Sequence, residues 1–171
     1  MHTMRLIIDA PAAGAWNMAT DEALLDAVSA GAGPSLRFYR WSPATVSLGY
    51  FQPAASCPDF VSDDSLAPCG ASERWAPTAR MKQWRYALVR RLTGGGAILH
   101  DDELTYSLAM PTGWPAIGGE PARLYAVAHR AIAAALNALG VPAGFHAGPC
   151  HGNAQRGPFF CFARRHCYDL T

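Results

Sequence analysis

Residues 90–107 read Arg90-Arg91-Leu92-Thr93-Gly94-Gly95-Gly96-Ala97-Ile98-Leu99-His100-Asp101-Asp102-Glu103-Leu104-Thr105-Tyr106-Ser107. Apolar residues precede this stretch at 86–89 and alternate with polar ones over 104–110, so the pattern predicts a turn between two strands. Glycine lacks a Cβ, and three glycines in a row let backbone N–H groups approach a ligand closely. Two adjacent arginines add fixed positive charge of the kind that binds phosphate or carboxylate. The stretch therefore predicts a sheet-held binding loop for an anionic ligand, with a tight hairpin and solvated arginines as the alternative.

The spacing of these glycines excludes two common nucleotide-binding motifs. A P-loop requires Lys-Ser or Lys-Thr after its glycines, and neither pair follows here. The glycine spacing also does not fit the Rossmann fingerprint. The whole string over 90–107 closely resembles the signature of the lipoate-protein ligase A and octanoyltransferase family, which is related to the biotin-protein ligases. By that resemblance, the site for an acyl group or acyl-adenylate includes these loop residues: Arg90, Arg91, Thr93, Gly94, Gly95, Gly96, Ala97 and His100.

Composition limits the class of protein. The chain has 171 residues, half of them hydrophobic, and 14 basic against 13 acidic side chains, which fits one globular domain and argues against a nucleic-acid partner. No apolar run reaches the ~18 residues of a membrane span, and the N-terminus leads into a short strand instead of a signal peptide. We therefore expect a cytoplasmic protein with no membrane partner. Five cysteines, an odd number in a domain of this size, predict free thiols instead of a disulfide framework.

A strand and a helix are expected near the N-terminus. Residues 5–9 form a short apolar strand in this interpretation, and apolar residues then recur at helical spacing over 18–28. Asn17 is predicted to be the N-cap of this helix, and glycine at 31 to end it. The run over 16–25 also resembles the opening helix of the family.

Two strands are expected to follow, over 36–41 and 45–52, and to pair as a hairpin around a Ser42-Pro43 turn. The pattern over 48–52 is similar to the hairpin that lines the acyl tunnel in this family. The resemblance therefore implies four residues near a medium-chain acyl group: Trp41, Gly49, Tyr50 and Phe51. An ordinary place in the sheet core is the alternative for the aromatic residues among them.

Residues 53–85 contain four prolines and no sustained period, so they predict a surface loop longer than such connections usually are. Relative to the family this loop is an insertion. A second helix is predicted over 121–139, with Pro121 near its start, Gly140 just after its end and an apolar face that covers the sheet.

Cysteines and histidines gather in the C-terminal segment over 145–171. They include no Cys-x2-Cys or His-x3-His pair that would anchor a zinc site, so no metal is expected. The string over 158–162 resembles the place where one octanoyltransferase branch carries its thioester-forming cysteine, and the resemblance implies Cys161 as the catalytic nucleophile. An inert cysteine buried among phenylalanines is the alternative.

The predicted fold is α/β of the α+β type, with a mixed or mainly antiparallel sheet backed by amphipathic helices. It forms a single domain over 1–171, like the biotin/lipoate ligase catalytic core. The reaction that the resemblance implies is transfer of an octanoyl or lipoyl group to a lysine of a lipoyl-carrier domain, either an E2 subunit or the glycine-cleavage H protein. Acyl carrier protein is the expected donor, and no covalently bound cofactor is expected. The segment 102–107 looks more like the transferases than the ligases, which favours a cysteine thioester route.

Two alternatives stay open. One is an ATP-dependent lipoate-protein ligase, which would use ATP and Mg. The other is a non-catalytic relative that binds acyl groups or carrier domains. Active members of the family carry a lysine in a Gly-x-Lys-x-x-Gly-Ser-Ala-like motif beyond the cysteine region, whereas Lys82 is the only lysine of this sequence. We therefore expect the chain to be incomplete at its C-terminus, and to transfer acyl groups slowly without that lysine.

Overall fold

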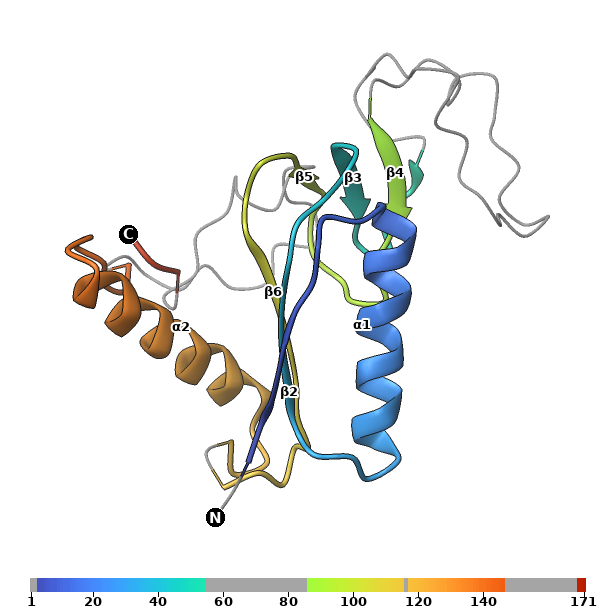
Figure 1. The fold of residues 1–171 in the computed structure, drawn as a ribbon. Coiled ribbons are helices and arrows are strands. Elements are labelled where there is room, and N and C mark those ends of the chain that lie inside the picture. The colour runs from blue at the N-terminus through green and yellow to red at the C-terminus, as the bar shows by residue number, and fades with distance from the viewer. Residues whose placement is uncertain (1–2, 55–85, 116, 147–168) are drawn as a thin grey trace.

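The computed structural model describes residues 3–54, 86–115, 117–146 and 169–171 (Figure 1). Six strands and two helices follow one another within these ranges. In chain order they are β1 (Arg5–Ile8), α1 (Gly14–Ser29), β2 (Ser35–Tyr39), β3 (Thr45–Leu48), β4 (Ala87–Arg90), β5 (Ile98–His100), β6 (Thr105–Ala109) and α2 (Pro121–Ala138). This is the α/β class with mixed sheets that the sequence predicted.

The strands form two mixed sheets. In the first, the order is β1-β2-β6, with β1 parallel and β6 antiparallel to β2. In the second, the order is β4-β3-β5, with β4 parallel and β5 antiparallel to β3. The stretch 90–107 runs from the end of β4 through β5 into β6, and therefore connects the two sheets.

One strand pairing expected from the sequence is wrong, and the tight hairpin given as the alternative for the glycine run does not form. The segments 36–41 and 45–52 form no hairpin, because β2 pairs with β1 and β6 while β3 pairs with β4 and β5. The glycine run is not a hairpin turn either, because β4 and β5 lie on opposite sides of β3. Alternation along a strand reports which residues share a face of the sheet, but it does not identify the strand that lies alongside.

Helix α1 begins earlier than predicted, at Gly14. Asn17 is not its N-cap but lies inside the helix, fully buried, where its amide donates to backbone carbonyls of two other segments. A Cβ on Gly14 would meet Cγ2 of Thr45 at 2.7 Å, so a glycine lets the helix start against β3. The end of the helix is predicted correctly, since Gly31 adopts a φ of +100° just beyond it.

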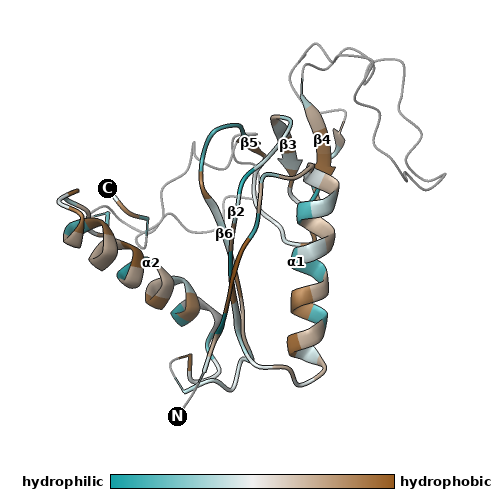
Figure 2. Ribbon diagram, viewed as in Figure 1, coloured by the Kyte–Doolittle hydropathy of each residue, from teal (hydrophilic) through white to brown (hydrophobic). Residues whose placement is uncertain are grey.

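A cluster of the apolar core lies in the second sheet. Val46, Leu48 and Ala97 are fully buried there, and Tyr86 and Leu88 pack against them. Figure 2 shows hydrophobic colouring along β4, which lies beside the central strand β3. The core therefore fixes the strand ends between which the glycine run lies.

The two helices lie on opposite sides of the β1-β2-β6 sheet (Figure 1). Helix α1 contacts β4 and β6, so it joins the two sheets. Helix α2 starts at Pro121 and is followed by Gly140 with a φ of +80°, as the sequence predicted. Within the described ranges, neither helix combines the length and the apolar character needed to cross a membrane.

Candidate functional site

The glycine loop, residues 91–97, lies against the end of β3. A Cβ on Gly49 would overlap the carbonyl oxygen of Gly95, so the two backbones are in direct contact. The N–H of Tyr50 donates to the carbonyl oxygen of Thr93 at 2.9 Å. Gly95 has a φ of +94°, in the left-handed region that glycine enters at little cost. Close approach therefore requires a glycine at position 49, and backbone conformation requires one at position 95.

Arg91 holds the glycine loop through its guanidinium group. Its Nη1 donates to the backbone oxygen and the Oγ of Ser47, at 2.9 and 2.7 Å. Its Nη2 donates to the carbonyl oxygens of Gly94 and Gly96, at 3.2 and 2.8 Å. A planar guanidinium presents its donors in fixed directions, so it holds these four oxygens in one arrangement. These N–H groups of Arg91 donate to oxygens of the protein itself, and the predicted role of Arg91 in ligand binding stays a prediction.

Arg90 holds the turn that follows β3. Its Nη1 donates to the carbonyl oxygens of Gly49, Tyr50 and Gln52, at 2.9, 2.8 and 2.7 Å. The rings of Tyr50 and Phe51 meet edge to face, with centroids 5.0 Å apart. They are 53% and 86% exposed. The turn therefore presents two aromatic rings at the surface, beside the glycine loop.

His100 is buried against Trp41 and uses both ring nitrogens. Its ring stacks on the indole with centroids 3.8 Å apart and planes 12° apart. Its Nε2 lies 2.8 Å from Oγ of Ser47, and its Nδ1 lies 2.5 Å from Oε1 of Glu103. Burial lowers the pKa of His100 below its ordinary value of 6.5, although the Glu103 carboxylate acts in the opposite direction. Both nitrogens are engaged inside the protein, and the predicted role of His100 in ligand binding stays a prediction.

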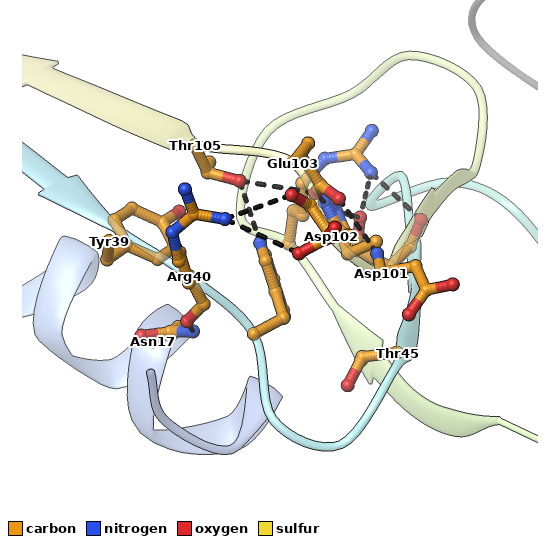
Figure 3. Close-up of polar contacts among 12 residues, drawn as sticks. Asn17, Tyr39, Arg40, Thr45, Asp101, Asp102, Glu103 and Thr105 are labelled. Atoms are coloured by element: carbon orange, nitrogen blue, oxygen red, sulfur yellow. Dashed lines mark hydrogen bonds and ion pairs between the residues drawn. The ribbon is translucent and has the colours of Figure 1, made fainter. Parts of the chain in front are cut away.

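Glu103 is the acceptor at which these contacts end. Besides the His100 ring, it accepts the backbone N–H of Asp101 at 2.8 Å and the hydroxyl of Thr105 at 3.3 Å (Figure 3). Thr105 itself accepts from Nε1 of Trp41 at 2.8 Å. Burial acts to raise the pKa of Glu103, but the hydrogen bonds it accepts outweigh burial and hold that pKa below its ordinary value. Glu103 is therefore a carboxylate near neutral pH, and its oxygens only accept.

The order Ser47, His100, Glu103 has the connectivity of a nucleophile, a base and an acid. Ser47, however, is fully buried, and its Oγ also accepts from Arg91. A hydroxyl that is shielded from substrate on every side has no electrophile to attack. The three residues therefore form no nucleophilic site in this structure.

A separate polar cluster lies between β2 and α1. Arg37 is fully buried, and its guanidinium lies 2.7 Å from a carboxylate oxygen of Asp9 and 2.9 Å from one of Asp21. It also donates to the backbone and side-chain oxygens of Asn17. Asp21 accepts the hydroxyl of Tyr39 at 2.8 Å, and burial together with this carboxylate raises the pKa of Tyr39 above its ordinary value of 10.0. The cluster joins β2 to α1 and is structural.

Most of the predicted site residues meet at or beside the glycine loop. Ala97 belongs to the apolar core, and Trp41 to the buried stack on His100. Ser47, Glu103 and Thr105 join the same region although the sequence analysis did not select them. The spacing of His100 and Glu103, three residues apart, is a local signal from which this pair could have been found.

Several predictions fall outside the described residues. They concern Cys161, the other cysteines and histidines between 147 and 168, and nearly all of the insertion at 53–85. Among the residues that the structure does describe, no three His, Cys, Asp or Glu side chains gather as a metal site would need.

Known proteins give independent matches to this chain. Octanoyltransferase LipM of Moorella thermoacetica is 37% identical over 156 residues, which are 91% of this chain and 50% of that protein. A crystal structure of lipoate-protein ligase A bound with ATP has a TM-score of 0.63 at 28% identity, and covers 92% of this chain and 53% of its own. A lipoate protein ligase from Thermoplasma acidophilum, described with its E2 lipoyl domain, has a TM-score of 0.61 at 27% identity over 86% of this chain and 49% of its own.

The chain spans about half the length of the curated relatives it matches. A family model, that of the lipoyl protein ligase A/B catalytic domain, matches residues 13–152. This range includes β2, β3 and the whole glycine loop, so the match covers the residues from which the candidate site is built. The chain belongs to the lipoyl protein ligase A/B catalytic domain family.

Proposed function

We propose that the chain transfers an octanoyl or lipoyl group to a lysine of a lipoyl-carrier domain. In this proposal octanoyl-acyl carrier protein is the donor, and Cys161 holds the acyl group between the two steps. The names of the curated relatives, which are octanoyltransferases, support the reaction class. The family resemblance around 158–162 supports the choice of cysteine.

The observation that carries the proposal is the arrangement of carbonyls in the glycine loop. The carbonyl oxygens of Gly94 and Gly96 accept from Arg91. In a trans peptide the C=O and the following N–H point in opposite directions, so the N–H groups of Gly95 and Ala97 point away from Arg91. Gly94 and Gly95 are exposed, and a Cβ on Gly94 would meet no atom within 4 Å. The loop thus offers a backbone donor, the Gly95 N–H, on an open side.

A backbone donor of this kind suits acyl transfer. In the first step the Cys161 thiolate would attack the thioester carbonyl carbon, a new C–S bond would form, and the carrier thiolate would leave. In the second step the lysine amine would attack the enzyme thioester, an amide bond would form as the amine loses a proton to solvent, and the C–S bond would break to release the Cys161 thiolate. Each step passes through a tetrahedral oxyanion, and preorganised N–H donors lower the free energy of such an oxyanion.

The ligase alternative makes a different demand on the arginines. An acyl-adenylate carries a phosphate, and the resemblance assigns its binding to the loop and Arg91. The guanidinium groups of Arg90 and Arg91 donate to backbone carbonyls at 2.7 to 3.2 Å, and a phosphate would compete with those oxygens. The similarity to an ATP-bound lipoate-protein ligase keeps this alternative in the test below.

The proposed acceptor is a lipoyl domain. The Thermoplasma acidophilum relative is described with its E2 lipoyl domain, which supports an E2 subunit or a similar carrier as the partner of this chain. The choice between E2 and the glycine-cleavage H protein, like residence in the cytoplasm, stays a prediction.

The experiment is an acylation assay on a purified lipoyl domain, read by intact mass. One reaction contains octanoyl-acyl carrier protein without ATP, and a second contains free octanoate with ATP and Mg. A lipoyl domain with its target lysine replaced by arginine is the control acceptor. We expect octanoylation of the normal acceptor in the first reaction only, and we expect it to be slow because the sequence has no lysine other than Lys82.

Three outcomes would contradict this expectation in different ways. Octanoylation only with octanoate and ATP would establish the ligase alternative. No octanoylation from either donor, with octanoate still bound by the chain, would favour the non-catalytic alternative. Octanoylation of the control acceptor would mean that the target is not the carrier lysine.

A further inference from the structure

We propose that Ser47, His100 and Glu103 are positioning residues for the glycine loop, joined in one hydrogen-bond chain with a fixed donor order. We call these three residues the positioning chain. Its assignment to acyl transfer rests on the proposed function, because that function makes the loop the acyl site. The arrangement of the loop itself does not depend on the function.

The donor order follows from the end groups of the positioning chain. At one end, the Arg91 guanidinium can only donate, so Oγ of Ser47 accepts from it. At the other end, the Glu103 carboxylate can only accept, so Nδ1 of His100 donates to it. In a neutral imidazole the second nitrogen then accepts, and the Ser47 hydroxyl supplies the proton at 2.8 Å. Every hydrogen bond in the chain is satisfied only when His100 carries its proton on Nδ1.

A second branch ends on the same carboxylate. Nε1 of Trp41 donates to the hydroxyl of Thr105, and that hydroxyl donates to Oε1 of Glu103. The Trp41 ring also stacks on His100, which restricts rotation of the imidazole. The backbone N–H of Asp101 occupies the other carboxylate oxygen at 2.8 Å. The imidazole is therefore held on its face and at both nitrogens.

The positioning chain reaches the loop through Arg91. The Ser47 hydroxyl and carbonyl hold Nη1, and this leaves Nη2 directed at the carbonyls of Gly94 and Gly96. These carbonyls set the directions of the loop N–H groups. Removal of the Ser47 hydroxyl would leave Nη1 of Arg91 with only the Ser47 carbonyl of these two acceptors. It would also leave Nε2 of His100 without its donor.

Replacement of Glu103 by glutamine changes the donor order without changing the shape. Glutamine offers one acceptor oxygen, and the backbone N–H of Asp101 requires an acceptor. The amide NH₂ then faces Nδ1 of His100, which can accept only if the ring proton moves to Nε2. Ser47 would receive two donors in that state, one from His100 and one from Arg91.

The experiment measures the ring proton and the loop in the chain without ligand. Long-range ¹H–¹⁵N correlation spectra above neutral pH report the tautomer of His100. Amide hydrogen exchange reports the order of residues 91–97. We expect an Nδ1–H tautomer in the unmodified chain, an Nε2–H tautomer in Glu103→Gln, and severalfold faster loop exchange in both Ser47→Ala and Glu103→Gln. Controls are Ser29→Ala and Asp102→Asn, whose side chains are exposed.

Each result bears on the proposal separately from the reaction. An Nε2–H or doubly protonated ring in the unmodified chain would overturn the donor order, and that measurement needs no variant to fold. Loop exchange in Ser47→Ala equal to that in Ser29→Ala would overturn the positioning role. In the acylation assay we expect Ser47→Ala to lose ~10²-fold in kcat with KM little changed, because a misplacement of ~1 Å can cost that much. Absence of acylation by the unmodified chain would contradict the proposed function and leave the tautomer and exchange results to decide the positioning role.

Discussion

The carbonyl oxygen of Gly95 occupies the space in which a Cβ on Gly49 would lie. No side chain separates the end of β3 from the glycine loop at this point, so the position of the loop is set by contact between two backbones. The N–H of Tyr50, which donates to the carbonyl of Thr93, reinforces the same contact.

This contact predicts that Gly49→Ala displaces the glycine loop. A methyl group at this position overlaps backbone atoms, which cannot rotate away as a side chain can. We expect a loss of about 1–3 kcal/mol in the free energy of unfolding, the usual cost of overpacking, together with loss of acyl transfer. Urea unfolding measures the first effect. Gly33→Ala is the matched control, because a Cβ there meets nothing within 4 Å, and an equal effect of both variants would contradict the contact.

Gly94 and Gly95 should respond differently to the same substitution. A Cβ on Gly94 meets no atom within 4 Å, and its backbone is not left-handed, so Gly94→Val should fold normally and still block a ligand. Gly95 has a φ of +94°, and valine there should cost about 1–3 kcal/mol of stability through backbone strain. Thermal unfolding and the acylation assay, run on both variants, separate the two effects. Normal transfer by a folded Gly94→Val chain would mean that no ligand approaches the loop at this residue.

The buried cluster at Arg37 predicts a large stability effect without a direct effect on chemistry. Arg37→Met would leave the carboxylates of Asp9 and Asp21, which are 36% and 23% exposed, without their buried partner, and this should cost up to about 3 kcal/mol. Arg40→Met is the control, because the ion pair of Arg40 with Asp102 is exposed and spans 3.5 Å (Figure 3). Urea unfolding of both variants should show a large loss for the first and none for the second. Similar losses would mean that the buried pair contributes no more than the exposed one.

The pKa of His100 predicts that stability falls at acidic pH. This pKa is lowered in the folded chain, so the unfolded chain takes up the proton first as the pH drops. Because the unfolded state then binds more protons, the free energy of unfolding should decrease as the pH falls below about 6.5. The lowered pKa of Glu103 also makes the free energy of unfolding fall with pH, but at lower pH. The Glu103 carboxylate stabilises the folded chain above its ordinary pKa of 4.5, and this stabilisation is lost as the pH falls below that value.

Urea unfolding over this pH range tests the assignment to His100. The unmodified chain should lose stability more steeply below about pH 6.5 than His100→Gln, in which the titrating group is absent. His129→Gln is a control for general effects of removing a histidine. An equal slope in the His100→Gln variant and in the unmodified chain would assign the acid sensitivity to other groups.

Local patterns predicted much of the fold. Strands β1, β2, β3, β4 and β6, both helices and the glycine ends of the helices follow from periodicity, glycine and proline positions, whereas β5 and the exposed aromatic turn after Leu48 were not predicted. Strand pairing did not follow, because β2 and β3 take partners that lie far along the chain. The alternation of side chains along a strand is compatible with several partner strands, so local criteria do not choose among them.

The buried polar contacts were the least predictable part of the site. Asparagine is a common N-cap residue, yet the side chain of Asn17 lies inside α1 and donates to backbone carbonyls of two other segments. Ser47 lies in a buried strand in which polar and apolar residues alternate, and it gives no local sign of its contacts with Arg91 and His100. These contacts depend on which strands become neighbours, so they follow only once the pairing of β3 with β5 is known.

The central claim, acyl transfer through Cys161, has one direct measurement. The chain is incubated with octanoyl-acyl carrier protein in the absence of a lipoyl domain, and its intact mass is recorded before and after hydroxylamine treatment. We predict a single octanoyl adduct that hydroxylamine removes, that is absent in Cys161→Ala, and that persists in Cys150→Ala and Cys167→Ala. An adduct that survives Cys161→Ala, or the absence of any thioester adduct in a chain that octanoylates a lipoyl domain from the same donor, would contradict the claim.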